Sequence, residues 1–391
     1  MSVPSAVIPD PLGGSLLVGE TEAARRRHGI LPSQGLRALI ADGVVTAEAP
    51  IGEDQVQPAS LDLRLGRTAY RVRASFLPGD GVPVRDRIAT FGMHQFDLTA
   101  GAVLEKGCVY IVPLMESVHL GRRLTGMANP KSSAGRLDIF TRLIADGAAE
   151  FDTLREGYSG PLYAEVSPRA FSVVVRTGDR LCQLRIRRGS PTASDSATRR
   201  LHEEVRLVDG DEAAVDIARG IAFSVDLRGS GERALIGYRA KRHTDLIDIS
   251  RIGHYDPLDF WEPIHAGREA FALLNPGDFY ILASREAVTV PPDHAAEMTP
   301  YDTRVGEFRV HYAGFFDPGF GFAGSGGAGS RGVLEVRSHE VPFVLEHGQV
   351  VGRLVYERLT EVPDKIYGTT IGSSYQSQGL RLAKQFRQLT V

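Results

Sequence analysis

Short runs in which apolar and polar residues alternate recur along the chain. The alternation is clear in "RLCQLRI" (180–186) and "GRLVYERL" (352–359), and a period of two predicts strands with one buried face. Helical pattern is sparse. One case is "LPSQGLRALIADG" (31–43), with Ser33 expected as its N-cap and Gly43 as its stop. The pattern therefore predicts a mainly β protein with few short helices.

The second half of the chain repeats the first half. "LEKGCVYIVPLMESV" (104–118) aligns with "LNPGDFYILASREAV" (274–288) at an offset of 170 positions, and Glu165 and Glu335 meet at the same offset. A constant offset over a long stretch is typical of a tandem duplication, so we expect two β barrels or sandwiches. The predicted division is an N-terminal extension over 1–30, a first domain over 31–189, a polar linker over 190–214 and a second domain over 215–391.

Composition and charge narrow the classes of function. The chain has 391 residues, 42% of them hydrophobic, a net charge of −3 and a pI of about 6.4. These values disfavour a general nucleic-acid binder or a membrane-surface protein, and no apolar run approaches the ~18–20 residues needed to span a bilayer. Cys108 and Cys182 lie in apolar strand-like runs, which favours reduced thiols and a cytoplasmic protein.

The first candidate for chemistry is "NPKSSAGRLDIF" (129–140). It places two cations and two hydroxyls in one short segment: Lys131, Ser132, Ser133 and Arg136. Guanidinium, ammonium and hydroxyl groups all donate hydrogen bonds to phosphate oxygens. The segment is a candidate phosphate site, and a solvated surface turn is the alternative.

The second candidate is "HYAGFFDPGFG" (311–321). Ala313 is small enough to let a flat ligand approach the backbone, and the turn at Pro318 and Gly319 would fix Asp317. The alternative is a hairpin corner in which Asp317 caps its own turn. The glycine-rich stretch that follows lacks the GxxxxGK[ST] spacing, so we exclude a P-loop and favour a flexible hairpin insertion.

The third candidate is the repeated glutamate. Glu165 and Glu335 each stand mid-strand beside apolar neighbours, where a carboxylate is costly unless it is paired or used. The alternative is a glutamate on the solvent face of a strand. No HxE…PCxxC signature occurs in the sequence, which excludes a zinc-dependent base deaminase.

Taken together, these segments resemble the dCTP deaminases of the trimeric dUTPase-like superfamily. The matching segments are "QPASLDLRLG" (57–66), "KSSAGR" (131–136), "GDRLCQLRI" (178–186), "AGFFDPGFG" (313–321), "GVLEV" (332–336), "GQVVGRLVYERL" (348–359) and "YGTTIGSSYQSQGLRL" (367–382). Two positions depart from the family pattern: Lys131 stands where arginine is usual, and Ser374 stands where lysine is usual.

The resemblance implies a dUTPase-like (β-clip type) fold for both halves and a zinc-free deamination of dCTP to dUTP and ammonia. A strand glutamate would activate the water, and Mg²⁺ would accompany the triphosphate. The expected partners are a deoxynucleoside triphosphate and further copies of the chain in trimer-type contacts, with no nucleic acid or membrane. The alternatives are a dUTP diphosphohydrolase, a bifunctional dCTP deaminase/dUTPase, or a non-catalytic nucleotide-binding regulator.

In this family, one site is shared between neighbouring copies of the fold. Here the second half has "YDTRVG" (301–306) in place of the phosphate motif, and the first half has "AAEFDTLREGYSG" (148–160) in place of the second candidate. We therefore expect one composite site and regard Glu165 as a structural relic. Its predicted residues are catalytic Glu335, Ser132 and Arg136, with Lys131, Ser133, Ala313, Asp317, Tyr375 and Gln378 binding the substrate.

Overall fold

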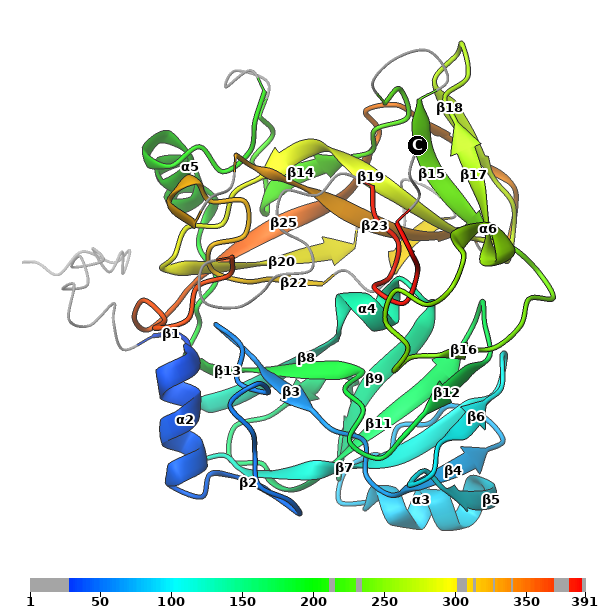
Figure 1. The fold of residues 1–391 in the computed structure, drawn as a ribbon. Coiled ribbons are helices and arrows are strands. Elements are labelled where there is room, and N and C mark those ends of the chain that lie inside the picture. The colour runs from blue at the N-terminus through cyan, green and yellow to red at the C-terminus, as the bar shows by residue number, and fades with distance from the viewer. Residues whose placement is uncertain are drawn as a thin grey trace, which may run out of the picture.

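The computed structural model describes residues 28–388 except 211–214, 230–233, 301–307, 312–313, 326–327, 339 and 369–379. Strands dominate the chain and helices are few, which confirms the prediction of a mainly β protein. Figure 1 shows two lobes, with the first half of the chain below and the second half above. Within the described residues, no helix has the length and apolar character to cross a bilayer.

The first lobe is built from three sheets. One has the order β1-β13-β8-β10 with β3 also on β13, another has the order β5-β4-β7-β11-β9 with β2 also on β7, and a small one has the order β16-β12-β6. The bounds of these strands are β1 Gly29–Ile30, β2 Val45–Ala47, β3 Leu61–Leu63, β4 Thr68–Val72, β5 Gly92–Asp97, β6 Ala102–Leu104, β7 Val109–His119, β8 Leu124–Pro130, β9 Ile139–Ala145, β10 Thr153–Leu154, β11 Ser159–Pro168, β12 Val173–Val175, β13 Cys182–Arg188 and β16 Ile247–Asp248.

The second lobe also has three sheets, with the orders β14-β25-β20-β22, β17-β15-β19-β23-β21 and β18-β24. The bounds of these strands are β14 Ile221–Ser224, β15 Leu235–Ala240, β17 Trp261–His265, β18 Phe271–Leu274, β19 Phe279–Val288, β20 His294–Pro300, β21 Phe308–His311, β22 Phe315–Phe316, β23 Ser330–Ser338, β24 Phe343–Glu346 and β25 Val350–Arg358. The register of the first lobe recurs here. Glu165 lies opposite Ile111 in the β11–β7 pair, and Glu335 lies opposite Ile281 in the β23–β19 pair, 170 residues later.

The helices are short: α2 Ser33–Ala41, α3 Val84–Phe91, α4 Ser132–Gly135, α5 Asp195–Glu204, α6 Pro257–Phe260 and the 3-10 turn η3 Ala323–Ser325. The helix expected within 31–43 is present, and Gly43 follows it with φ 71°. The expected cap is wrong, however, because Pro32 is the N-cap and Ser33 is the first helical residue. The hydroxyl of Ser33 donates instead to Asp364. The segment predicted to be a polar linker contains α5, whose N-cap is Ser194.

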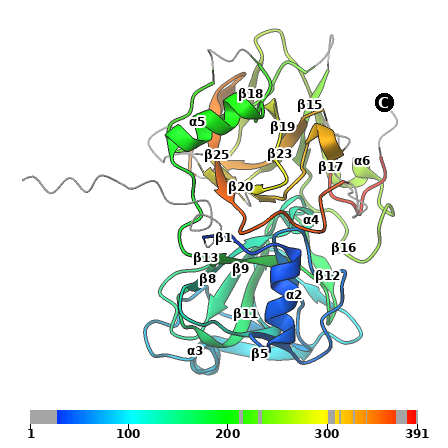
Figure 2. The ribbon, with the colours of Figure 1, turned by 90° about the vertical axis from the view of Figure 1, so that its left-hand side faces the viewer.

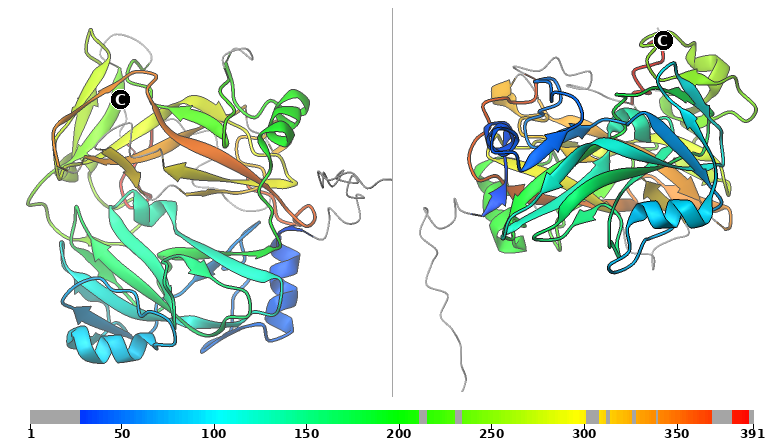
Figure 3. Two further views of the ribbon diagram at one scale, coloured as in Figure 1. Left: turned by 180° about the vertical axis from the view of Figure 1, so that it is seen from behind. Right: turned by 90° about the horizontal axis from the view of Figure 1, so that it is seen from below.

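The junction between the lobes is formed within one chain. The ring centroid of Phe171 in the first half lies 5.7 Å from that of Phe260 and 5.3 Å from that of Trp261. Strand β16 crosses from the second half and pairs in parallel with β12, placing Ile247 opposite Val173. Figures 2 and 3 show the lobes stacked, with α4 between them. The candidate phosphate motif therefore lies where the two halves meet.

Candidate active site

The candidate phosphate motif begins at the end of β8 and continues into α4. The Lys131 Nζ atom lies 2.5 Å from Oδ1 of Asp62 on β3. Within the described part of the chain, the hydroxyls of Ser132 and Ser133 have no hydrogen-bond partner. Arg136 is buried and donates from Nη1 to the carbonyl of Arg381, at 3.2 Å. The motif thus offers two free hydroxyls between two positioned cations.

Glu335 is buried in the middle of β23. It lies between Ile281 of β19 and His311 of β21 in the strand register, and its side chain is 4% exposed. Burial raises the pKa of the Glu335 carboxyl well above its usual range, and the charge of Arg136 offsets part of this increase. Among the described residues, none forms an ion pair with Glu335. A buried carboxyl with a raised pKa is suited to accept and return a proton during a reaction.

Asp317 follows β22 at the start of a turn. Its Oδ1 atom lies 3.6 Å from Nη2 of Arg185, a residue of β13 in the first half. Burial raises the pKa of Asp317, and the charges of Arg185 and Lys131 work in the opposite direction. The Oδ1 atom is itself buried and accepts no hydrogen bond from the described residues. Asp317 is therefore held by cations of the first half while one of its acceptors remains available.

The structure brings most of the predicted site residues into one region of a single chain. Lys131 and Arg136 from the first half act electrostatically on Asp317 and Glu335 from the second half. Ala313, Tyr375 and Gln378 lie outside the described residues. The C-terminal tail contacts the Asp317 turn at Tyr367, shortly before residues 369–379. The Tyr367 backbone N–H donates to the carbonyl of Pro318 at 3.0 Å.

Two family models divide the chain between them. The N-terminal domain of 2'-deoxycytidine 5'-triphosphate deaminase (DCD) matches residues 27–190, and the C-terminal domain matches residues 194–386. A "dCTP deaminase, dUMP-forming" of Halobacterium salinarum is 33% identical over 191 residues, which cover 46% of this chain and 90% of that protein. The chain belongs to the dCTP deaminase family.

Two further comparisons extend the likeness. A "dCTP deaminase, dUMP-forming" of Streptomyces coelicolor is 30% identical over 151 residues, covering 37% of this chain and 75% of that protein. The crystal structure of 2'-deoxycytidine 5'-triphosphate deaminase from Agrobacterium tumefaciens is 59% identical with a TM-score of 0.82. It covers 85% of this chain and 99% of that chain. The likeness to this family member therefore includes both halves of the chain.

In this chain, the two copies of the repeated glutamate, Glu165 and Glu335, lie in different environments. Glu165 is 1% exposed on β11, and its Oε1 atom lies 2.6 Å from Nη2 of Arg142 on β9. The Arg142 guanidinium lies over the rings of Phe151, at 3.4 Å, and Phe140, at 4.6 Å. An aromatic-backed arginine thus neutralises Glu165, whereas Glu335 has no such partner among the described residues.

Replacing Glu165 with glutamine is expected to lower thermal stability and leave the deamination rate within about threefold of the wild type. The substitution leaves the partly buried Arg142 guanidinium without its counter-charge, which destabilises the fold. The hydrogen bonds described for the Glu165 side chain involve none of the predicted site residues. The melting temperature and the rate of ammonia release from dCTP measure the two effects. Loss of turnover in a folded Glu165→Gln protein would show that the first half carries a second active site.

Four charged residues that pair with or approach residues of this region were not among the predicted site residues. Asp62 pairs with Lys131, Asp138 pairs with Arg337, and Arg185 approaches Asp317. Asp62 stands in the quoted segment "QPASLDLRLG", and its charge beside apolar residues was a usable signal. The Arg185 and Arg337 contacts cross between the two halves, and no local pattern in the sequence indicates them.

Proposed function

We propose that the protein catalyses the hydrolytic deamination of dCTP at the composite site. The observation that carries the proposal is the buried carboxyl of Glu335 on β23. Burial raises its pKa, and the charge of Arg136 from the first half lowers it in part. Attack of water at C4 of cytosine requires a group that accepts a proton from water and donates one to the ring. The family membership and the names of the relatives support the same substrate.

In the proposed mechanism, the ionised Glu335 takes a proton from the attacking water as its oxygen bonds to C4. Glu335 passes this proton to N3, then moves the second proton from the new hydroxyl to the amino group. The C4–N bond breaks, ammonia leaves and the C4 carbonyl forms, so each proton is accounted for. Ser132 and Arg136 would fix the water and the base against Glu335.

The substrate would be held by the remaining predicted residues. Lys131 and Ser133 would bind phosphate oxygens, and the free Oδ1 acceptor of Asp317 would receive a donor from the nucleotide. Ala313, Tyr375 and Gln378 would complete the pocket around the base and close over it. The free hydroxyls of the phosphate motif support this arrangement, since they are donors without another partner in the described chain.

Mg²⁺ would enter with the triphosphate. The described residues contain no cluster of three His, Cys, Asp or Glu side chains suited to a resident metal. Mg²⁺ commonly binds through substrate phosphates with one or two carboxylates, and Asp62 and Asp179 line the pocket beside the phosphate motif. The ion would neutralise phosphate charge there. In this proposal Glu335 activates the water without zinc.

We further propose that each half is a dUTPase-like β-clip unit and that the protein is a cytoplasmic homo-oligomer. The shared 170-residue register of β7–β11 and β19–β23 supports the two-unit arrangement. Cys108 and Cys182 are free thiols, in keeping with a reducing compartment. The interface between the two halves of this chain would replace one of the interfaces that single-domain relatives form between subunits.

The product is dUTP if deamination is the only reaction. The names of the two relatives above state that they form dUMP, which favours a second candidate, a bifunctional enzyme that also releases pyrophosphate. In that case Asp317 would orient a water molecule toward the α-phosphate. The two candidates share substrate and site. They differ only in whether pyrophosphate is released together with ammonia.

Incubation of the purified protein with dCTP and Mg²⁺ tests the proposal, with ammonia and pyrophosphate followed together. We expect ammonia in every case. Ammonia with accumulating dUTP indicates a monofunctional deaminase, and ammonia with equimolar pyrophosphate and dUMP indicates the bifunctional enzyme. Neither product from a folded protein that binds dCTP would overturn the proposal and favour a nucleotide-binding regulator.

A further inference from the structure

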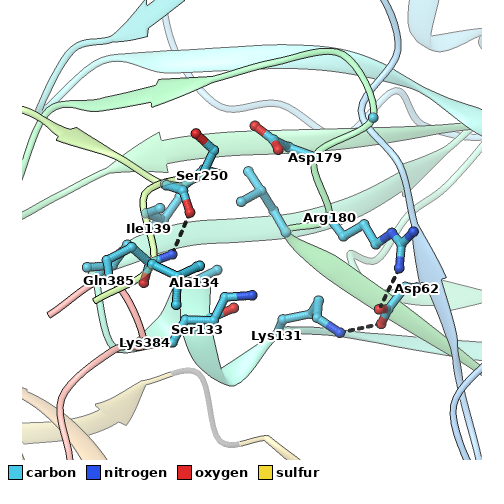
Figure 4. A pocket seen from close by; sticks show the side chains of 15 residues that line it. Asp62, Lys131, Ser133, Ala134, Ile139, Asp179, Arg180, Ser250, Lys384 and Gln385 are labelled. Carbon is cyan, nitrogen blue, oxygen red and sulfur yellow. Dashed lines mark hydrogen bonds and ion pairs between the residues drawn. The ribbon is translucent and has the colours of Figure 1, made fainter. Parts of the chain in front are cut away.

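A cavity of about 410 Å³ adjoins the phosphate motif on the side of the first half. The cavity is lined by Lys131 and Ser133 of the phosphate motif and by Lys384 and Gln385 of the C-terminal segment. Figure 4 shows the side chains of Ser133, Lys131 and Lys384 around the same opening. The cavity therefore extends the phosphate motif toward a part of the tail that the sequence analysis did not assign.

The charges in this cavity are unevenly paired. Lys131 pairs with Asp62 at 2.5 Å, and Arg180 pairs with Asp54 at 2.5 Å. Asp179 accepts a hydrogen bond from the backbone N–H of Arg176 at 2.6 Å and so closes its own turn. Lys384 forms no ion pair with any residue in the described ranges. The Lys384 ammonium and the Asp179 carboxylate are thus two charges of the cavity without an ion pair among the described residues.

Both cations and carboxylates line the cavity around Lys384. Burial lowers the pKa of Lys384 and the charge of Lys131 lowers it further, whereas the charges of Asp62 and Asp179 raise it. An anion between the two ammonium groups would relieve this repulsion. The hydroxyl of Ser133, which lines the same cavity and has no hydrogen-bond partner among the described residues, provides a further donor.

Packing of the C-terminal segment fixes the position of Lys384. Leu382, Ala383 and Phe386 are buried on either side of it. The Lys384 carbonyl accepts a hydrogen bond from the N–H of Gly253 at 2.9 Å, and the neighbouring Gln385 amide donates to the carbonyl of Ile249 at 2.8 Å. The backbone that carries the ammonium is thus anchored, so less entropy is lost when Lys384 binds a ligand.

We infer that Lys384 binds the terminal phosphate of the nucleotide and makes the site selective for a triphosphate. The inference rests on the proposed function, since that function assigns the phosphate motif that lines the same cavity. Lys384 is the only lysine after Lys365, and Ser374 stands where the resembled motif has lysine.

The test compares Lys384→Met with Lys384→Arg in the full-length chain carrying Glu335→Gln, which is expected to slow turnover by at least about 100-fold. Calorimetric titration with dCTP and with dCMP gives the two affinities. We expect Lys384→Met to weaken dCTP binding by about 10- to 100-fold, the effect of one charge-assisted hydrogen bond, and dCMP binding by less than about threefold. Lys384→Arg should restore most of the dCTP affinity because it keeps the charge.

Lys365→Met is the matched control, because Lys365 is the other tail lysine and binds Glu53 and the carbonyl of Val56 instead of the cavity. Equal weakening of dCTP and dCMP, or no weakening of either, would overturn the inference. Loss of inorganic phosphate binding with unchanged dCTP affinity would also overturn it, since the cavity would then be a free-phosphate site. Ammonia release by the wild type tests the deaminase function separately from all of these results.

Discussion

Glu335→Gln is expected to lower kcat for ammonia release from dCTP by at least about 100-fold while leaving dCTP binding largely intact. Glutamine keeps the size of the side chain and its ability to hydrogen-bond, but it cannot accept the proton of water, and positioned acid–base catalysis contributes about 10²–10⁴-fold. Single-turnover ammonia release and dCTP titration separate the two effects. Near-normal turnover in the folded variant would show that another group activates the water.

The pH dependence of the wild type gives a second measure of the same group. Glu335 must be ionised to accept a proton, and burial raises its pKa well above the usual range. We therefore expect kcat/KM to fall as the pH is lowered through this raised pKa, at a higher pH than an ordinary glutamate near ~4.3 would give. The acid limb belongs to Glu335 only if Glu335→Gln removes it from the residual activity.

Glu335→Gln is expected to raise stability at high pH although it lowers activity. The reason is the link between proton binding and folding. The folded state favours the protonated carboxyl, so it binds this proton more tightly than the unfolded chain does. The stability contributed by Glu335 is present below the unfolded pKa and is lost as the pH rises through the raised folded pKa. Above that range the glutamine variant should melt at a higher temperature than the wild type, as expected for a site that sacrifices stability for function.

The residue pattern was sufficient to predict that the protein is mainly β with few helices. Alternation in "RLCQLRI" and "GRLVYERL" predicted strands, and both segments are found in β13 and β25. The repeat predicted that Glu165 and Glu335 occupy equivalent strand positions, and their registers opposite Ile111 and Ile281 agree with this. These features depend on local periods and on comparison of the chain with itself, which a sequence provides directly.

The difference between the two glutamates was visible in the sequence but was not used. Arg142 neutralises Glu165, and the residue 170 positions after Arg142 is Tyr312, which has no charge. That single comparison predicts that Glu335 lacks the partner of Glu165. Ser33 shows the opposite case: its type suggested a cap, but Pro32 takes the cap position and leaves Ser33 free to bond Asp364, more than 300 residues away.

Contacts between the halves could not be predicted from local pattern. Arg185 alternates with apolar residues in β13, a position that usually faces solvent, yet the residue is completely buried against the second half. Its guanidinium donates to the carbonyls of Ala296 and Phe316 at 3.1 and 3.0 Å and lies 3.8 Å from the ring centroid of Phe315. Only the packing of the two halves creates this environment, which makes Arg185 a candidate positioning residue for Asp317.

Arg185→Met is therefore expected to lower kcat/KM for dCTP by about tenfold or more, beyond its effect on stability. Methionine fills much of the space but leaves Asp317 without its nearby cation and two buried carbonyls without donors, so the turn that carries Asp317 loses its support. Removing one partner of a buried pair costs about 3–5 kcal/mol of folding free energy. Arg185→Lys should not restore activity, because one ammonium cannot replace the planar fork over Phe315.

Arg187→Met separates positioning from simple cohesion of the two halves. Arg187 lies on the same strand and also crosses the junction, pairing with Glu297 at 2.9 Å and Glu357 at 2.8 Å, but it has no contact with the Asp317 turn among the interactions described. Its loss should destabilise the protein by a similar amount and leave kcat/KM within about threefold at a temperature where both variants are folded. If the two variants lose activity equally and in proportion to their stability, Arg185 only joins the halves. If Arg185→Met alone loses activity, the second half depends on Arg185 of the first half to position Asp317.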